Sequence, residues 1–283
     1  MTIATVAENK AFEGVQGVYS HDSVTTRCPM RFGVYMPPQS RDRPVPAVYW
    51  LSGLTCTEEN FIVKAGAQRI ASSLGLALVV PDTSPRVAIA GDRDQWDFGV
   101  GAGFYVDATR EPWSRHYRMD SYVSAELPEV VAGRFNVDPH RMSIVGHSMG
   151  GHGALVLALR NPDRYRAVSA FAPIASPMRC PWGEKALSGY LGDDRVAWRA
   201  YDATALIEDR GWTGPALLVD QGLNDPFIDT QLKPDLLEQT CGNAGVPLNL
   251  RRHPGYDHSY FFIATFIDDH LRYHATHLSD ALS

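Results

Sequence analysis

The pentapeptide Gly146-His147-Ser148-Met149-Gly150 (GHSMG) decides the fold of this chain. It follows a short apolar run, residues 142–145, that we expect to be a strand, and it precedes a stretch with helical periodicity that begins near Gly150. A serine on such a sharp turn must adopt strained backbone angles, and a glycine two residues to either side lets neighbouring chain pass close. Taken alone, the pentapeptide could equally be a glycine-rich turn whose serine caps a helix. The flanking strand and helix favour a nucleophilic serine.

Outward from this turn, predicted strands alternate with predicted helices. This alternation indicates a mainly parallel central sheet with helices on both faces, and together with the serine turn it indicates the α/β-hydrolase fold. Extended segments at residues 15–21 and 30–36 favour an antiparallel start to the sheet. The expected strands are residues 45–51, 77–80, 142–145, 167–170, 216–219 and 248–252, and the expected helices are residues 65–74, 121–135, 150–160, 230–244 and 259–274.

Length and composition predict one large domain spanning residues 1–283. A chain of 283 residues with 45% hydrophobic content fits a single core, and no linker or repeat divides it. Residues 83–120 fit no regular period and are rich in glycine and aromatic residues. In an open α/β sheet, long irregular connections wall the ligand crevice at the carboxyl ends of the strands, so we expect this segment to do so.

Charge and cysteine content narrow the classes of function. The net charge of −6 is spread without long runs, which favours neither nucleic acid nor a membrane surface as a partner. The apolar stretches fall short of the roughly 20 residues of a spanning helix, and residues 1–10 lack a secretory signal pattern, so a cytoplasmic location is expected. We expect four free thiols, at Cys28, Cys56, Cys180 and Cys241.

A serine nucleophile needs a histidine base, which in this fold follows it in the chain. His258 is our choice because it lies in a turn between the strand at residues 248–252 and an apolar helix, and His253 at the strand edge is the runner-up. His270, His274 and His277 share one helical face at spacings that could suit a metal. A solvated helix face is the favoured interpretation of these three, and we expect no metal.

A catalytic triad also needs a carboxylate that orients the base, and in this fold that residue should lie between Ser148 and the histidine in the chain. Asp225 fits, because it lies in a loop directly after the strand at residues 216–219. Gly222 and Pro226 frame that loop tightly, so it can direct one carboxylate inward. Asp220 and Asp229 are weaker candidates, because each can equally be explained as a turn residue or a helix cap.

Two backbone N–H groups should stabilise the oxyanion. Met149, the residue after the nucleophile, supplies the first, and Leu54 is our choice for the second because it lies in the loop after the strand ending at Leu51. Nearby Cys56 could be a second nucleophile, but we expect it to line the pocket.

The residues named above resemble those of the S-formylglutathione hydrolase family, also called esterase D, and several long stretches carry this resemblance over nearly the whole chain. The resemblance implies that Ser148, Asp225 and His258 are the catalytic triad and that Leu54 and Met149 form the oxyanion hole. The stretches are residues 49–64 (YWLSGLTCTEENFIVK), 81–86 (PDTSPR), 96–109 (WDFGVGAGFYVDAT), 144–155 (IVGHSMGGHGAL), 180–185 (CPWGEK) and 255–267 (GYDHSYFFIATFI).

The resemblance also implies a homodimer without metal or other cofactor that hydrolyses S-formylglutathione to formate and glutathione and cleaves short-chain esters. The sequence departs from the family pattern at Val87, at Asp120 and at residues 222–224. From the aromatic-rich stretches we expect the substrate pocket to be lined by Cys56, Trp96, Trp182 and Tyr260, although core packing would also explain the three aromatic residues. The basic candidates for the glutathione carboxylates are Lys64, Arg86, Arg115 and Lys185.

Three other functions remain open from the sequence. A general carboxylesterase or an acyltransferase would use the same serine site. A non-catalytic scaffold is possible because fold does not determine function, but the intact order of serine, aspartate and histidine speaks against it.

Overall fold

One nine-stranded sheet organises the chain. The computed structural model describes residues 2–90, 92 and 95–279. The strand order is β1-β2-β3-β5-β4-β6-β7-β8-β9, and strands β4 to β9 are all parallel to one another. Parallel strands end at the same edge of a sheet, so the loops after β4, β6, β8 and β9 meet there. The parallel strands are β4 (Val45–Leu51), β5 (Ala77–Pro81), β6 (Val137–His147), β7 (Val168–Phe171), β8 (Leu217–Gly222) and β9 (Leu248–His253).

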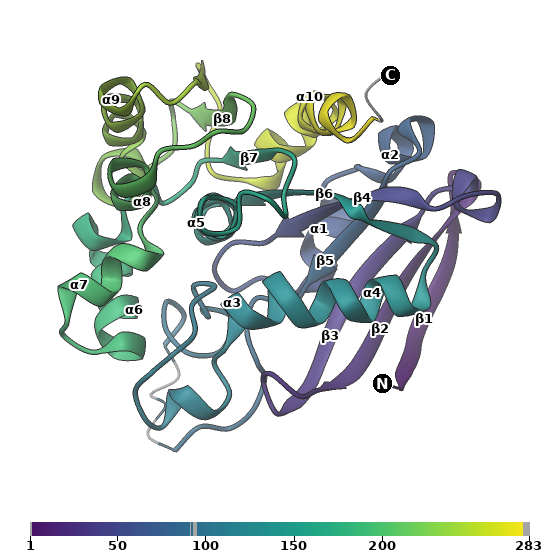
Figure 1. Cartoon of the computed structure of the whole chain (residues 1–283), viewed down its shortest axis with the longest axis horizontal. Coiled ribbons are helices and arrows are strands. Elements are labelled where there is room, and N and C mark those ends of the chain that lie inside the picture. The colour runs from purple at the N-terminus through teal and green to yellow at the C-terminus, as the bar shows by residue number, and fades with distance from the viewer. Residues whose placement is uncertain (1, 91, 93–94, 280–283) are drawn as a thin grey trace.

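The sheet begins with an antiparallel ribbon, as expected. Strands β1 (Ile3–Ala11), β2 (Gly14–Ser23) and β3 (Cys28–Met36) pair in sequence order, and β3 then pairs antiparallel with β5. In Figure 1 these purple strands form one side of the molecule, and β1 is the edge strand.

Helices cover both faces of the sheet (Figure 1). Helices α2 and α10 pack on one face and α4 and α5 on the other, while α6 to α9 gather beside β7 and β8. The alternation of strands and helices therefore produces the predicted layered architecture. The helices are α1 (Glu58–Lys64), α2 (Gln68–Leu74), α3 (Met119–Ser121), α4 (Leu127–Arg134), α5 (Met149–Arg160), α6 (Pro181–Leu191), α7 (Arg195–Trp198), α8 (Ala203–Arg210), α9 (Pro234–Ala244) and α10 (Tyr260–Leu278), with π-helical turns at Tyr122–Glu126 and Ile228–Leu232.

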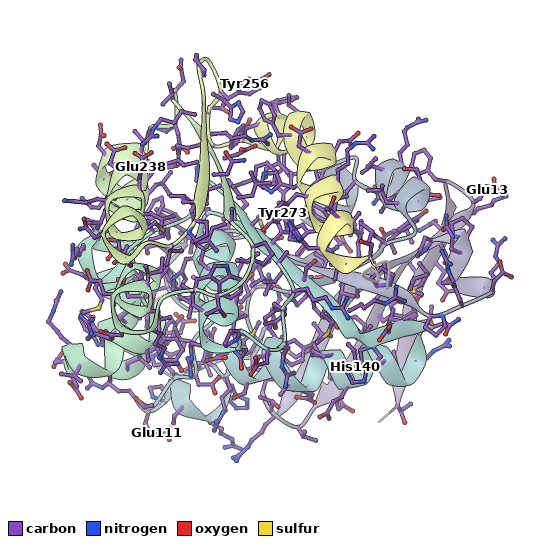
Figure 2. All side chains as sticks on the ribbon, turned by 45° about the horizontal axis from the view of Figure 1, so that its top comes forward. Glu13, Glu111, His140, Glu238, Tyr256 and Tyr273 are labelled. Carbon is purple, nitrogen blue, oxygen red and sulfur yellow. The ribbon has the colours of Figure 1, made fainter. Side chains whose placement is uncertain are left out.

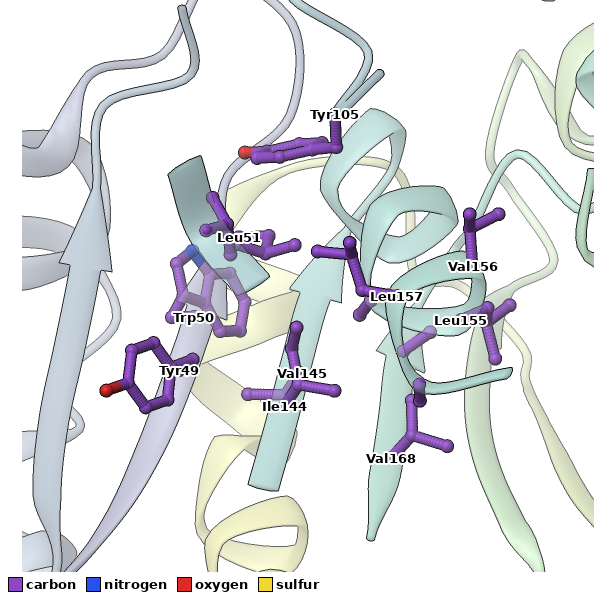
Figure 3. Close-up of a cluster of buried hydrophobic side chains, with 14 of the residues drawn as sticks. Tyr49, Trp50, Leu51, Tyr105, Ile144, Val145, Leu155, Val156, Leu157 and Val168 are labelled. Carbon is purple, nitrogen blue, oxygen red and sulfur yellow. The ribbon is translucent and has the colours of Figure 1, made fainter. Parts of the chain in front are cut away.

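The main core lies between the central strands and α5. Figure 3 shows Leu51 of β4 beside Leu157 of α5, while Trp50 of β4 and Val145 of β6 are paired residues of the two neighbouring strands, and all four side chains are buried. Because β6 and α5 are fixed by this core on either side of residue 148, the turn between them is held rigidly.

The second core layer lies under α10. Figure 2 shows side chains filling the space between α10 and the strands, where Tyr273 is labelled. The Tyr273 hydroxyl donates a hydrogen bond to the carbonyl of Ala216, 2.8 Å away, just before β8. Helix α10 is thus tied to the strand that leads to the Asp225 loop.

Several predicted boundaries were wrong. The helix expected at residues 65–74 begins only at Gln68, because the chain turns at Gly66, which has a φ of 69°, and helix α1 before that turn was not predicted. Strand β6 begins five residues before the expected 142, since Pro139 and its polar neighbours conceal the strand pattern. Helices α6 to α8 were not predicted.

Candidate active site

The turn at Ser148 has the strained geometry that a nucleophile turn requires. Ser148 has φ 58° and ψ −118°, outside the regions favoured by residues with a side chain, and it is 3% exposed. A Cβ on Gly146 would lie 2.1 Å from the carbonyl oxygen of Gly150, and a Cβ on Gly150 would lie 1.9 Å from the carbonyl oxygen of Leu51. Glycine is therefore required at both positions, as the sequence predicted.

The predicted acid and base are in contact. Nδ1 of His258 lies 2.5 Å from Oδ2 of Asp225, and the Asp225 side chain is fully buried while that of His258 is 16% exposed. The other carboxylate oxygen, Oδ1, accepts a hydrogen bond from the Phe227 backbone N–H at 2.9 Å. A carboxylate held in this way fixes the tautomer with a proton on Nδ1, so Nε2 is left to accept a proton.

The loops that carry Asp225 and His258 are bonded to each other. The Asn224 N–H donates to the carbonyl of Tyr256 at 2.8 Å, and the Leu223 N–H donates to the carbonyl of His253 at 3.0 Å. The two loops approach closely at Gly222, where a Cβ would lie 2.4 Å from the carbonyl oxygen of Tyr256. Acid and base are therefore positioned as one unit at the ends of β8 and β9.

This unit meets the serine turn through His147. The ring of His147 packs against the ring of His258 with centroids 4.4 Å apart. Burial, and then the charge of His258, lower the pKa of His147 far below its ordinary value, so it stays neutral. Since His147 directly precedes Ser148, the contact brings Ser148, His258 and Asp225 to one end of the sheet.

The loop after β4 also reaches the nucleophile. A Cβ on Gly53 would lie 3.2 Å from Cβ of Ser148, so the chain approaching Leu54 passes directly beside the serine. The N–H of Met149, the first residue of α5, has no acceptor within the helix. The two residues predicted for the oxyanion hole thus lie on segments that flank Ser148.

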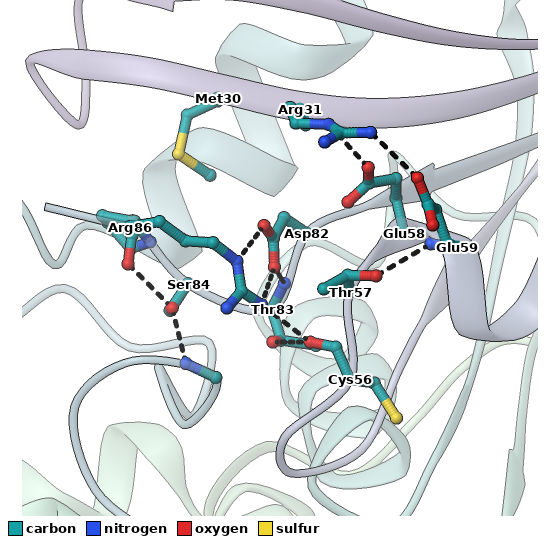
Figure 4. A network of polar contacts seen from close by, with 12 residues as sticks. Met30, Arg31, Cys56, Thr57, Glu58, Glu59, Asp82, Thr83, Ser84 and Arg86 are labelled. Atoms are coloured by element: carbon teal, nitrogen blue, oxygen red, sulfur yellow. Dashed lines mark hydrogen bonds and ion pairs between the residues drawn. The ribbon is translucent and has the colours of Figure 1, made fainter. Parts of the chain in front are cut away.

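A polar network supports that loop from behind. Arg86 is held by the carboxylate of Asp82, with N–O distances of 2.6 and 2.9 Å (Figure 4). The carbonyl of Cys56 accepts hydrogen bonds from the Thr83 hydroxyl at 2.5 Å and from Arg86 at 3.2 Å. Arg86 is consequently a structural residue of the loop.

Aromatic side chains extend from the base along one wall. Phe227 packs edge-on to His258 with centroids 5.2 Å apart, Trp182 lies 4.8 Å from Phe227, and Trp96 lies 5.4 Å from Trp182. Trp182 is buried, whereas Trp96 is 57% exposed. The structure therefore places Trp182 near the base and Trp96 farther out, in contact with solvent.

Cys56 and Tyr260 lie together on the other side. The Tyr260 ring is 6.4 Å from that of His147. Burial raises the pKa of the Cys56 thiol, although the Tyr260 hydroxyl and the Lys64 ammonium act in the opposite direction. A thiol with a raised pKa is a weak nucleophile at neutral pH, which agrees with a lining role for Cys56.

The alternative site residues serve the fold. Asp220 is bound by Arg251 through two 2.6 Å contacts and lies 3.3 Å from Nε2 of both His253 and His270. The prediction of a solvated face for the C-terminal histidines was wrong for two of them, because His270 and His274 are buried and both contact the Ser169 hydroxyl at 2.8 Å. Among the described residues, no three His, Cys, Asp or Glu side chains form a metal-binding group.

Two further neighbours of the site, His147 and Phe227, were not predicted from the sequence. Both contact the ring of His258. Their positions next to Ser148 and two residues after Asp225 are the only signal in the sequence, and that signal does not say which way either ring points.

The fold and site define an esterase of the α/β-hydrolase class. The family model named Esterase matches residues 23–273. No helix in the described part of the chain is long and apolar enough to cross a membrane.

Relatives narrow this class further. The chain is 54% identical to S-formylglutathione hydrolase of Rattus norvegicus, over 99% of this chain and all of the relative, and 52% identical to that of Arabidopsis thaliana, over 96% and 97%. A solved structure of S-formylglutathione hydrolase from Agrobacterium tumefaciens superimposes with a TM-score of 0.95 at 50% identity, over 98% of this chain and all of that one. The chain belongs to the S-formylglutathione hydrolase family.

Proposed function

We propose that this protein hydrolyses the thioester S-formylglutathione to formate and glutathione, with Ser148 as nucleophile, His258 as general base and Asp225 as the orienting acid. The observation that carries the proposal is the 2.5 Å contact between Asp225 and His258 at the end of the sheet where Ser148 occupies its strained turn. The names of the full-length relatives supply the substrate.

In the first half of the reaction, Nε2 of His258 takes the hydroxyl proton of Ser148 while the oxygen attacks the formyl carbon. The oxyanion is stabilised by the N–H groups of Leu54 and Met149, each donor being worth roughly 2.7–4 kcal/mol in comparable enzymes. The carbon–sulfur bond breaks, and glutathione leaves as a thiolate that takes its proton from His258. A thiolate leaves more readily than an amine, so little acid assistance is needed.

In the second half, His258 removes a proton from water, and the resulting hydroxide attacks the formyl-serine ester. The bond between carbon and the Ser148 oxygen breaks, the serine recovers its proton from the imidazolium, and formic acid leaves and gives its proton to solvent to become formate. Asp225 stays ionised and stabilises the imidazolium in both halves.

We propose that bulky side chains restrict the acyl side of the pocket to a formyl or similarly short group. Trp182, in the aromatic wall beside His258, and the pair Cys56 and Tyr260 on the opposite side support this arrangement. Trp96 is assigned to the outer part of the site because it is half exposed. Residues 83–120, which include Trp96, would wall this side of the crevice.

We further propose that the chain is one catalytic domain that works as a homodimer in the cytoplasm. The continuous nine-stranded sheet supports a single domain. Free thiols at all four cysteines suit a reducing compartment, which cell fractionation would test. The homodimer is supported by the family resemblance.

Replacing the nucleophile tests the central proposal. We expect Ser148→Ala to lower kcat for both S-formylglutathione and p-nitrophenyl acetate by about 10⁶-fold, the scale of loss for a serine nucleophile. Ser73→Ala on the outer helix α2 is the control and should keep full activity. An active Ser148→Ala enzyme would refute the assignment. Ester cleavage without thioester cleavage by the unmodified protein would identify a general carboxylesterase, and a folded protein inactive on both would identify a scaffold.

A further inference from the structure

One cation at the edge of the site has no carboxylate partner among the described residues. Lys64 is the exposed last residue of α1, and its ammonium lies 5.7 Å from the centroid of the Tyr260 ring. A lysine over an aromatic ring keeps its three N–H donors free for another partner. Lys64 is thus available to bind an anion.

The other three basic candidates are not available in this way. Arg86 is held by Asp82, and Lys185 is paired with Asp97. Arg115 precedes His116, whose Nδ1 lies 2.8 Å from the carbonyl oxygen of Thr26, so Arg115 lies near the loop between β2 and β3 in the antiparallel part of the sheet. Among these four candidates, all of them in the described part of the chain, only Lys64 combines a charge that has no carboxylate partner with a contact to the site.

Lys64 is connected to the reacting groups by a short series of contacts. Its ammonium lies over Tyr260, the Tyr260 ring is 6.4 Å from that of His147, and His147 packs on His258 at 4.4 Å. The positive charge of Lys64 also lowers the pKa of the Cys56 thiol, against the larger effect of burial. Lys64 therefore lies at the rim beside the loop that carries Leu54.

The chemistry of a glutathione thioester fits a cation at that distance. Its two carboxylates and one ammonium give a net charge of about −1 at neutral pH, while the protein has a net charge of −6 and repels it. An extended tripeptide spans about 10 Å, so a carboxylate can reach the rim while the acyl carbon lies at Ser148. We propose that Lys64 binds a carboxylate of the glutathione moiety, an inference that rests on the proposed function.

Substrate charge provides the test. We expect Lys64→Met to raise KM for S-formylglutathione about two- to fivefold, as for the loss of an exposed ion pair. The ratio of kcat/KM for S-formylglutathione to kcat/KM for the neutral ester p-nitrophenyl acetate should fall by the same factor. Lys64→Arg should restore the wild-type ratio. Lys10→Met removes the same charge from a distant exposed site on β1 and should leave the ratio unchanged.

Salt gives a second readout. Because added salt screens exposed charges over about 8 Å at physiological strength, KM of the wild type for S-formylglutathione should rise with salt more steeply than that of Lys64→Met. Suppose that the wild type hydrolyses both substrates, and that Lys64→Met and Lys10→Met have the same ratio of kcat/KM values and the same dependence of KM on salt. The Lys64 inference is then refuted, while the proposed function stands. A wild type that cleaves only the neutral ester refutes the proposed function itself.

Discussion

Two neutral imidazoles flank Ser148 in the chain, His147 immediately before it and His152 four residues after it. Burial lowers the pKa of both, that of His152 to about 4. A positive charge on either would disfavour the imidazolium that the proposed mechanism forms on His258, since like charges at short distance repel. Their neutrality therefore supports proton transfer by His258.

His152 gives a prediction about stability and pH. Its Nε2 lies 3.1 Å from the carbonyl of Phe104, a contact that the neutral ring satisfies by donating. Because the folded pKa, about 4, is below the ordinary 6.5, its stability contribution is complete above pH 6.5 and is lost as the pH falls towards 4. We expect the free energy of unfolding of His152→Gln to fall about 3 kcal/mol less than that of the wild type between pH 7 and pH 4. Urea titrations at both pH values would measure this, and equal decreases would contradict it.

At the scale of elements, the site depends on how closely helix α5 approaches strand β4. The contact is made at Gly150, and the same approach sets the distance between Ser148 and the Gly53 loop. Strands β8 and β9 fix the other half of the site through their bonded loops. Catalytic geometry thus depends on two element contacts that involve few side chains.

Gly150→Ala tests the first of these contacts. The new Cβ would lie 1.9 Å from the carbonyl oxygen of Leu51, so α5 must move and carry Ser148 with it. We expect kcat/KM to fall by about 100-fold or more, the cost of a displacement near 1 Å. The matched control is Gly133→Ala in α4, where nothing lies within 4 Å of the added Cβ. Wild-type activity in Gly150→Ala would contradict the argument, and circular dichroism would establish that both variants fold.

Local patterns in the sequence were enough to predict the serine turn and the mainly parallel sheet, and they pointed to Asp225 and His258, which the structure brings into contact. These patterns could not predict the structure where one sequence pattern is compatible with two different structures. The spacing of His270 and His274 fits a solvated face and a buried face equally, and only the packing of α10 on β7 distinguishes them. Helix α1 was missed although Thr57 and Asn60 form a capping box at its start, because asparagine is an unusual partner in that motif.

At the scale of the molecule, all the proposed catalytic groups lie at one end of the sheet, and the antiparallel ribbon β1–β3 lies to one side of it. No strand in the described part of the chain pairs with the outward edge of β1, but Glu8 and Lys10 place charges on this strand. Charged edge strands resist pairing with other strands. We therefore expect subunits to associate without extending the sheet.

The homodimer is testable by mass. Sedimentation velocity at micromolar concentration should give a mass about twice the 31.2 kDa of the chain. Dithiothreitol should leave this mass unchanged, because all four cysteines are free thiols in the chain and three of them are buried. A species of 31.2 kDa at every concentration would contradict the homodimer.

The edge-to-face pair of Trp96 and Trp182 gives the protein an intrinsic optical signal. Trp96 is open to water, and the pair connects through Phe227 to the ring of His258. A molecule occupying the outer site would shield this indole from a dissolved quencher such as iodide. Indole fluorescence would therefore follow binding and release in real time without an attached dye.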